Sequence, residues 1–252
     1  MAMSAPFVTT IIAVTLVVAV LLGMWLRSLL PQDHLSGDSK DAVKVALGMV
    51  ATMTALLLGL LVSSAKGYYD TTRAEIVQMA AKAAFLDRAL TMYGPDATEA
   101  RVELHAALGE AIAGLWPEEG VAVRLAPDER AGDAVYVAIH RLTPRDDVQR
   151  DLKTEAKTLT TQLAELHSLL VAQSSPSVSM PMLVTVDCWL VVIFAGFSLV
   201  APRNATTTVA LIAAVLSVVG AVFLVLELET PLSGIIRISS APLQKVLGDL
   251  KQ

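Results

Sequence analysis

The residues best placed to do chemistry lie along one face of an apolar helix. The segment 45–65 carries no charge, yet small and hydroxylated residues recur in it every three or four positions, a spacing that puts them on a single helix face. The candidates for lining a pore on this face are Gly48, Thr52, Ala55, Gly59 and Ser63. Charged residues continue the face at both ends, as pore mouths often do. The mouth candidates are Asp41, Lys44 and Lys66.

A packing seam between helices is the alternative explanation of this face. Small residues let membrane helices approach closely, and hydroxyl groups hydrogen-bond across such seams. Lysines at the ends of a membrane helix also reach toward the interface without any role in a pore. A later stripe of small residues repeats the pattern: Ala210, Ala213, Ser217 and Ala221. The spacing alone leaves the pore and the seam both open.

Four segments are long and apolar enough to cross a membrane, which takes about 20 residues. They are 7–26, 45–65, 183–201 and 205–226. The chain is 54% hydrophobic, above the roughly 45–50% of soluble domains, and its mean hydropathy is +0.61. The first segment exceeds the usual core of a signal peptide and no Lys or Arg precedes it. We therefore expect it to be a retained membrane helix.

Basic residues are unevenly distributed over the predicted connections. Four crossings put both termini and the region 66–184 on one side, where 15 of the 19 Lys and Arg residues fall, and leave 4 on the other. The positive-inside rule then predicts that both termini and the 67–177 section are cytoplasmic.

Residues 67–177 are expected to form a helical bundle. The segment 71–93 continues the second apolar segment without a helix breaker until a Gly-Pro pair, and Asp96 then follows as a predicted helix cap. Later, a heptad-like seam predicts a helix that packs against residues 71–90. The seam residues are Leu152, Ala156, Leu159, Leu163, Leu166 and Leu170.

The sequence therefore predicts an all-α integral membrane protein with four transmembrane helices and a helical cytoplasmic domain inserted between spans 2 and 3. The predicted parts are transmembrane helices 1 and 2 at 1–66, the cytoplasmic bundle at 67–177, transmembrane helices 3 and 4 at 178–229, and an interfacial tail at 230–252. The tail mixes apolar and basic residues, which is typical of a segment that lies on a membrane or on the bundle.

No other set of residues indicates catalysis or a bound cofactor. The four histidines and the single cysteine, Cys188, lack the spacing of a zinc site. The chain has no nucleotide loop and no Ser/His/Asp arrangement, and its net charge of −5 argues against a nucleic-acid partner. We expect no enzyme activity, metal or cofactor. One acid, Asp187, lies inside the third apolar segment, where an acid is a functional candidate by default.

Three blocks of sequence carry a resemblance to a known family. They are the stretch from HLSGDSKD to SSAKGYYD at 34–70, LTPRDDVQRDL at 142–152, and APRNATT at 201–207 taken with LELETPLSGIIRISSAPL at 226–243. They resemble a bacterial membrane family that is described as bestrophin-like and catalogued as a domain of unknown function. The family-motif positions are His34, Asp38, Lys40, Arg203, Asn204, Glu227, Pro231 and Gly234.

The resemblance implies an architecture and a function. Bestrophins proper are ring-forming, usually pentameric, ion channels with four membrane helices and a large helical cytoplasmic domain, and their second membrane helix lines the pore neck. The resemblance thus implies a multi-pass protein of the bacterial inner membrane, a homo-oligomer whose partners are the lipid bilayer, its own copies and ions. The chain departs from bestrophins in segment 45–65, which has no Phe, Tyr or Trp.

Two functions fit the sequence. The first is an oligomeric channel for small ions, with the second transmembrane helix lining the conduit. The second is a non-conducting membrane scaffold or signalling protein whose cytoplasmic bundle docks a partner. A proton-driven stator fits the four spans as well, but it would need an acid deep in a span, and the sequence places Asp187 near the start of one.

Overall fold

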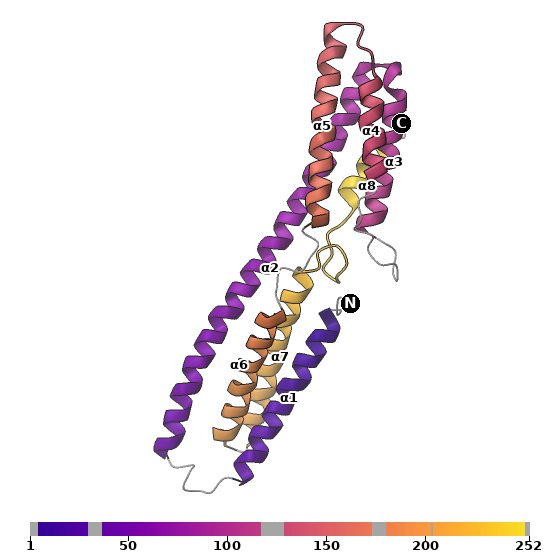
Figure 1. Ribbon diagram of the computed structural model, residues 1–252. Helices are drawn as coiled ribbons and strands as arrows, with labels where there is room; N and C mark the ends of the chain where they lie inside the picture. The colour runs from indigo at the N-terminus through magenta and orange to yellow at the C-terminus, as the bar shows by residue number, and fades with distance from the viewer. Residues whose placement is uncertain (1–4, 30–36, 117–128, 173–179, 203, 250–252) are drawn as a thin grey trace. The chain divides into compact units, whose positions relative to one another are not determined.

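The structure, a computed structural model, describes residues 5–29, 37–116, 129–172, 180–202 and 204–249, and most of these residues are helical (Figure 1). The elements in chain order are α1 (Ala5–Leu29), α2 (Gly37–Tyr93), the 3-10 turn η2 (Pro95–Ala97), α3 (Thr98–Leu115), α4 (Glu129–Arg141), α5 (Asp147–Ala172), α6 (Met180–Val200), α7 (Ala205–Leu228) and α8 (Ala241–Asp249). No strand occurs in these ranges, which confirms the all-α prediction.

Two compact units divide the chain, and the long helix α2 contributes to both. The first unit comprises Met1–Tyr69, Ser177–Thr230 and Gly234–Ile236, and the second comprises Asp70–Pro176, Pro231–Ser233 and Arg237–Gln252. α2 runs for 57 residues without interruption, because its sequence contains no proline and its glycines are isolated. The predicted continuation of the second apolar segment through residue 93 is therefore confirmed.

The first unit packs α1, α6, α7 and the first part of α2 around an aliphatic core. Four helices are long and apolar enough to cross a membrane: Ala5–Leu29, Lys40–Tyr93, Met180–Val200 and Ala205–Leu228. Each of them contributes to the core, whose buried members include Leu16, Leu61, Leu190 and Val222. These helices correspond to the four apolar segments of the sequence.

The backbones of α1 and α6 approach closely at Gly23. A methyl group built on Gly23 would lie 2.3 Å from the carbonyl oxygen of Ala195 and 2.8 Å from Cβ of Ser198. Glycine is needed here because any side chain would push the two helices apart. On α7, by contrast, a methyl group on Gly220 would meet no atom within 4 Å among the neighbouring described residues.

Gly23→Ala is therefore expected to lower the unfolding temperature of the detergent-solubilised protein. Overpacking costs about 1–3 kcal/mol, more than the roughly 1 kcal/mol that alanine gains over glycine in a helix. Gly220→Ala is the matched control and should leave the unfolding temperature unchanged or raise it. Thermal unfolding followed by circular dichroism checks both, and no loss in Gly23→Ala would contradict the close approach of α1 and α6.

The second unit is a bundle of α3, α4, α5, α8 and the second part of α2. Its core cluster includes Leu86, Leu90, Leu104, Ile139 and Ala156, and the seam residues Leu152, Leu159 and Leu163 pack against that cluster. A hydrogen bond also joins α2 to α5, where Nζ of Lys82 donates to Oε1 of Gln162 at 2.6 Å. The predicted packing of the seam against residues 71–90 is confirmed.

A capping arrangement holds the start of α5 and links it to the end of α2. Oδ1 of Asp146 accepts from the backbone N–H of Gln149 at 2.7 Å, and Oε1 of Gln149 accepts from the N–H of Arg145 at 2.8 Å. Nε2 of Gln149 donates to the carbonyl of Tyr93 at 2.9 Å. This reciprocal pattern is that of a capping box, so the block LTPRDDVQRDL has a structural role as a helix start.

The prediction that Asp96 caps the next helix is wrong. The residue before α3 is Ala97, which makes no side-chain capping hydrogen bond. Asp96 lies inside the turn η2, one residue too early to cap α3, and its Oδ2 forms an ion pair with the guanidinium of Arg145 at 2.6 Å.

The last part of the predicted tail belongs to the second unit. Nε1 of Trp116 donates to the carbonyl of Ile238 at 2.8 Å, and Leu243 of α8 is fully buried where α8 packs on α3. Of the two surfaces that the composition of the tail indicated, this part therefore lies on the bundle. An interfacial position for residues 230–236 stays a prediction.

A histidine in α5 makes the stability of the second unit depend on pH. Burial lowers the pKa of His167 below its usual value, which is about 6.5. Below about pH 6.5 the unfolded chain therefore binds a proton that the folded protein does not, and the stability falls as the pH falls. We expect His167→Gln to weaken the drop in unfolding temperature between about pH 7.5 and about pH 5.5. The exposed His140, replaced by Gln, is the control, and an equal effect of both would contradict the assignment.

Candidate functional site

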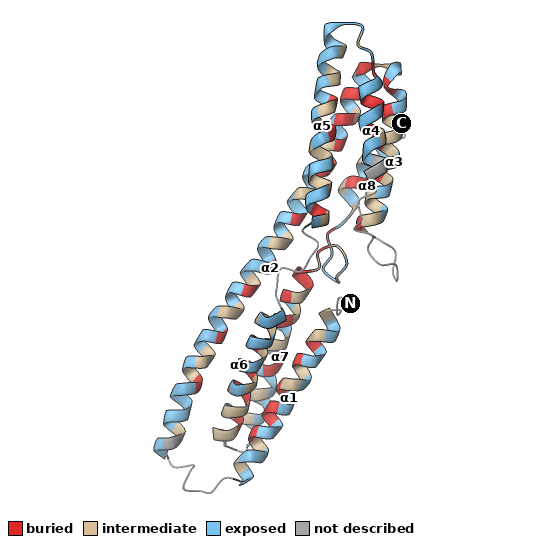
Figure 2. Cartoon of the chain, viewed as in Figure 1, coloured by how far each residue is buried: buried red, intermediate tan, exposed pale blue. Residues whose placement is uncertain are grey.

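The part of α2 in the first unit has three different faces. One face packs into the helix bundle and is buried: Leu47, Thr54, Leu61 and Ala65. Figure 2 shows this face as short red stretches along a helix that is otherwise mostly pale blue. The remaining positions fall on two further faces that lie about a quarter turn apart around the helix.

The small face of α2, made of Gly48, Thr52, Ala55, Gly59 and Ser63, is the predicted pore-lining stripe. Four of its members are exposed and Gly48 is half-buried. A methyl group built on Gly48 or Gly59 would meet no neighbouring described atom within 4 Å. The small face is therefore not a packing seam within the described part of the chain, and it remains open to water or to another chain.

The bulky face of α2 is also uncovered, but it is strongly apolar. Its residues, each 61–72% exposed, are Val45, Met49, Met53, Leu56 and Leu60. By contrast, Leu61 of the same helix is buried in the bundle. The bulky face has the composition of a surface that meets lipid or an apolar neighbour.

Hydroxyl groups on α2 bond back to its own backbone. Oγ1 of Thr52 donates to the carbonyl of Gly48 at 2.9 Å, and Oγ1 of Thr54 donates to the carbonyl of Val50 at 2.8 Å. The donor of each threonine is thus satisfied inside the helix, while its oxygen can still accept. The exposed Thr52 therefore presents a hydrogen-bond acceptor at the surface of the helix and leaves no unpaired donor.

The predicted mouth residues are exposed at both ends of the small face. Nζ of Lys44 lies 2.9 Å from Oδ1 of Asp41, one turn earlier, so these two charges largely neutralise each other. At the other end, Nζ of Lys66 lies 5.4 Å from the ring centre of Tyr69, within range of a cation–π interaction. Both ends of the small face therefore carry exposed charged groups.

Several family-motif positions have structural roles. Asp38 lies in the first turn of α2, where a carboxylate interacts favourably with the helix dipole. Lys40, two residues later, is half-buried. Asn204 caps α7, since its side-chain oxygen accepts from the N–H of Thr207 at 2.8 Å. His34 and Arg203 lie outside the described residues.

Glu227 holds the turn that follows α7. It is 1% exposed, and its Oε2 accepts from the backbone N–H groups of Ile235 at 2.5 Å and Ile236 at 3.3 Å. A methyl group on Gly234 would lie 2.6 Å from the same oxygen. The buried Pro231 begins this turn. The motif positions Glu227 and Gly234 therefore hold the same turn together.

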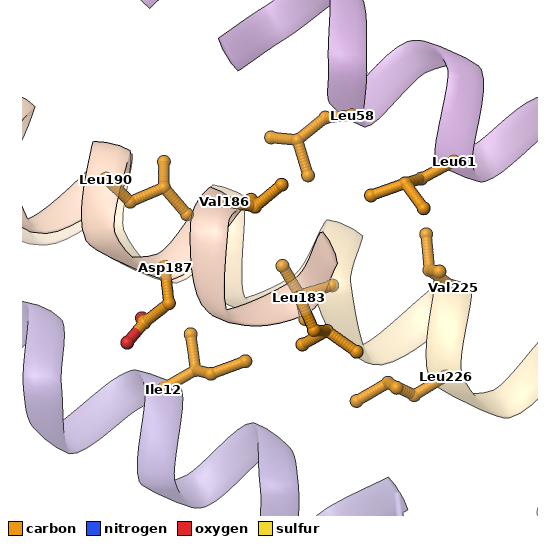
Figure 3. A pocket seen from close by; sticks show the side chains of 10 residues that line it. Ile12, Leu58, Leu61, Leu183, Val186, Asp187, Leu190, Val225 and Leu226 are labelled. Atoms are coloured by element: carbon orange, nitrogen blue, oxygen red, sulfur yellow. The ribbon is translucent and has the colours of Figure 1, made fainter. Parts of the chain in front are cut away.

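An apolar cavity with one acid in its wall lies where the four helices of the first unit meet (Figure 3). Its volume of about 10 Å³ is close to that of a single water site. The lining includes Ile12, Leu58, Val186, Asp187 and Val225. Oδ1 of Asp187 lies 3.0 Å from Oγ1 of Thr15 on α1. No metal-type group of three or more His, Cys, Asp or Glu side chains occurs in the described ranges.

Comparison with known proteins identifies the family. A family model described as the bestrophin-like domain matches residues 14–243. The chain belongs to the bestrophin-like family. The crystal structure of a bacterial bestrophin homologue from Klebsiella pneumoniae, carrying a mutation, matches with a TM-score of 0.68 and 16% identity over 96% of each chain. That likeness shows a common fold. No curated protein matches the sequence.

Membership in the bestrophin-like family confirms the resemblance carried by the three sequence blocks, all of which fall within or overlap the matched range. It supports a bestrophin-type channel at the level of the family. Two relationships in the site were missed by the sequence interpretation. Thr15 is one of few hydroxyls in α1, and that rarity was the only sign of its pairing with Asp187. The link between Glu227 and Gly234 has no periodic pattern at all.

Substitutions in the turn after α7 test its role. Glu227→Ala removes the acceptor of two backbone N–H groups and should cost about 1–3 kcal/mol of stability, while Gly234→Ala places a methyl group against the carboxyl oxygen. Because both changes break the same turn, we expect the double variant to lose less than the sum of the two. Ser233→Ala, at an exposed position of the turn, is the control. If the losses of stability in the two single variants add up to the loss in the double variant, the two residues do not stabilise the same turn.

Proposed function

We propose that this protein is a subunit of an oligomeric membrane channel that conducts small ions, with the small face of α2 lining the conduit. The observation that carries the proposal is that Gly48, Thr52, Ala55, Gly59 and Ser63 stay uncovered while the inward face of the same helix is buried. Membership in the bestrophin-like family supports a channel of this type. In this proposal the protein is a homo-oligomer, because a conduit needs the small faces of several copies.

The two uncovered faces of α2 suit different surroundings. Side chains on the bulky face remove a large apolar area from water when they meet lipid or a neighbouring subunit. The small face offers little apolar area, and it adds hydroxyl oxygens and accessible backbone to the surface. A ring of copies in which the small faces point to the axis gives each face the contact that it suits, and it leaves a wide lumen because the side chains are short.

The proposal includes an orientation and a location. The four apolar helices cross the bacterial inner membrane, and both termini and the 67–177 domain lie in the cytoplasm, as the distribution of Lys and Arg indicates. Lys66 then sits at the cytoplasmic mouth, and the Asp41–Lys44 pair sits at the opposite mouth. Catalysis has no part in this function.

A non-conducting scaffold is the second candidate, and the open glycines give it a specific basis. Helices of two copies could approach closely at Gly48 and Gly59, with the small faces in contact and no water between them. On the second unit, Val77, Phe85 and Met92 of α2 are 50–62% exposed and offer an apolar surface for a partner. The two candidates differ in whether the small face is exposed to water in the assembly or packed against another copy.

Cysteine accessibility distinguishes a wet face from a dry one. In a Cys188→Ala background, single cysteines are placed at Thr52 or Ser63 on the small face and at Leu56 on the bulky face. All three positions are exposed in the subunit, so only their surroundings in the assembly differ. A charged thiol reagent should react quickly with the cysteines at 52 and 63 and change the current in planar bilayers, because thiolates form in water and not in lipid.

The cysteine at position 56 is the matched control and should react slowly without an effect on the current. Rapid reaction at 56 with protection at 52 and 63 would overturn the pore assignment. Absence of current under any salt, together with protection at 52 and 63, would favour the scaffold.

Large substitutions at the open glycines separate the candidates in a second way. Gly59→Leu should reduce the conductance while leaving the size of the oligomer unchanged if the small face lines a conduit. The same change should dissociate the oligomer if the face is a seam between copies, since a leucine keeps the two backbones apart. Single-channel recording and light scattering on the same preparation measure both properties.

A further inference from the structure

Two polar side chains, both half-buried, meet between the largely apolar helices α1 and α6. Oγ1 of Thr15 lies 3.0 Å from Oδ1 of Asp187 and 2.8 Å from the carbonyl oxygen of Ile12, one turn earlier in α1. Both distances are those of hydrogen bonds. In the close view of Figure 3, the carboxyl group of Asp187 points toward α1.

A threonine hydroxyl has one proton to donate, whereas both of its neighbours here are oxygens. If Thr15 donates to the carbonyl of Ile12, its contact with Asp187 is a hydrogen bond only when the carboxyl group supplies the proton. A protonated Asp187 therefore satisfies both contacts at once, with Asp187 donating to Thr15 and Thr15 donating to Ile12. An ionised Asp187 would have to compete with the carbonyl for the single hydroxyl proton.

The surroundings favour the protonated form for a second, independent reason. α6 has 21 residues and Asp187 is the eighth of them, so at 1.5 Å per residue it lies about 10 Å from the start of the helix. A carboxylate at such a depth is costly unless a cation pairs with it. The neighbouring cavity has room for about one water molecule and is otherwise apolar.

None of the described residues that face Asp187 from the neighbouring helices is titratable. On α1 the nearest is Arg27, twelve residues beyond Thr15, and on α2 the nearest are Lys66 and Tyr69, beyond the cavity residue Leu61. On α7 it is Glu227, whose carboxyl group accepts from two backbone N–H groups of the following turn. Its neighbour on α6, Cys188, is exposed.

We propose that Asp187 is an intramembrane proton-binding site that stays protonated at neutral pH and clasps α6 to α1 through Thr15. This inference rests on the proposed membrane position of α1 and α6, and it does not depend on whether the protein conducts. Loss of the proton at high pH replaces a satisfied pair by a half-buried carboxylate on an apolar helix, with no cation beside it in the described residues, so the contact between the two helices weakens. The site thus couples proton binding to the packing of α1 against α6, the two helices that also approach closely at Gly23.

Infrared spectroscopy of the protein in lipid bilayers tests the proposal without any measurement of current. Protein with isotopically labelled aspartate carboxyl groups is compared with its Asp187→Asn variant at neutral pH, so that glutamates do not contribute to the shifted band. We expect wild-type protein to show the band of a protonated aspartate, and the variant to lose that band. A spectrum in which the variant instead loses a carboxylate band would overturn the proposal.

Thermal unfolding as a function of pH supplies a second readout. Asparagine can donate to Thr15 as the protonated acid does, so Asp187→Asn should keep the unfolding temperature of the wild type at neutral pH and lose its fall at alkaline pH. Asp187→Ala should unfold at a lower temperature at every pH. A stability of Asp187→Asn as low as that of Asp187→Ala would contradict the proton-donating role. If the protein conducts no ions but the infrared spectra show a protonated Asp187, the proposed function is wrong and the proton-binding site still stands.

Discussion

Every face of a helix in a membrane has to contact lipid, protein or water. The described residues of the chain cover one face of α2 and leave two faces uncovered. Its inward face, with Leu61 and Ala65, completes the core of the first unit. The bulky and small faces are left without a partner in the described part of the chain. Because one of them is apolar and the other small and hydroxylated, the two faces suit different surroundings, and the proposed assembly of several copies provides both.

Many polar groups of the first unit have hydrogen-bond partners, which an apolar solvent favours. Hydroxyls such as Thr52 and Thr54 bond to carbonyls of their own helix. Asn204 caps α7, and Glu227 takes up two backbone N–H groups of the turn after it. An unpaired group would cost several kcal/mol in hydrocarbon. This constraint also underlies the protonation of Asp187, since a shared proton pairs it where no cation is present.

Periodicity allowed the sequence to predict elements and faces, because the spacing of side chains around a helix is fixed by its geometry. The four apolar helices, the continuous α2 and the leucine seam of α5 were all accessible in this way. The small face was also found, together with its two interpretations. The spacing could not say what the small face contacts. Only the structure showed that no described residue of the same chain packs against Gly48 or Gly59, so the small face is not a seam within one chain.

Contacts between residues distant in the chain could not be predicted from the sequence, because helical spacing does not say which residues are neighbours in space. The pairing of Thr15 with Asp187 joins two helices 172 residues apart, and the turn of Glu227 depends on backbone N–H groups that any residue could supply. Asp96 shows the opposite error, in which the sequence predicted a contact that the structure lacks. Its residue type suits a helix cap, but the short turn η2 comes before α3 and moves the start of that helix beyond Asp96. Such contacts follow from the path of the chain in space rather than from local pattern.

Imaging of the purified protein in lipid nanodiscs by electron cryomicroscopy tests the central claim most directly. The account predicts a ring of identical subunits in which Gly48, Thr52 and Ser63 of every α2 face a continuous water-filled axis, with Leu56 turned away from it. A monomer, or an assembly in which the small faces of neighbouring subunits touch with no space between them, would contradict it.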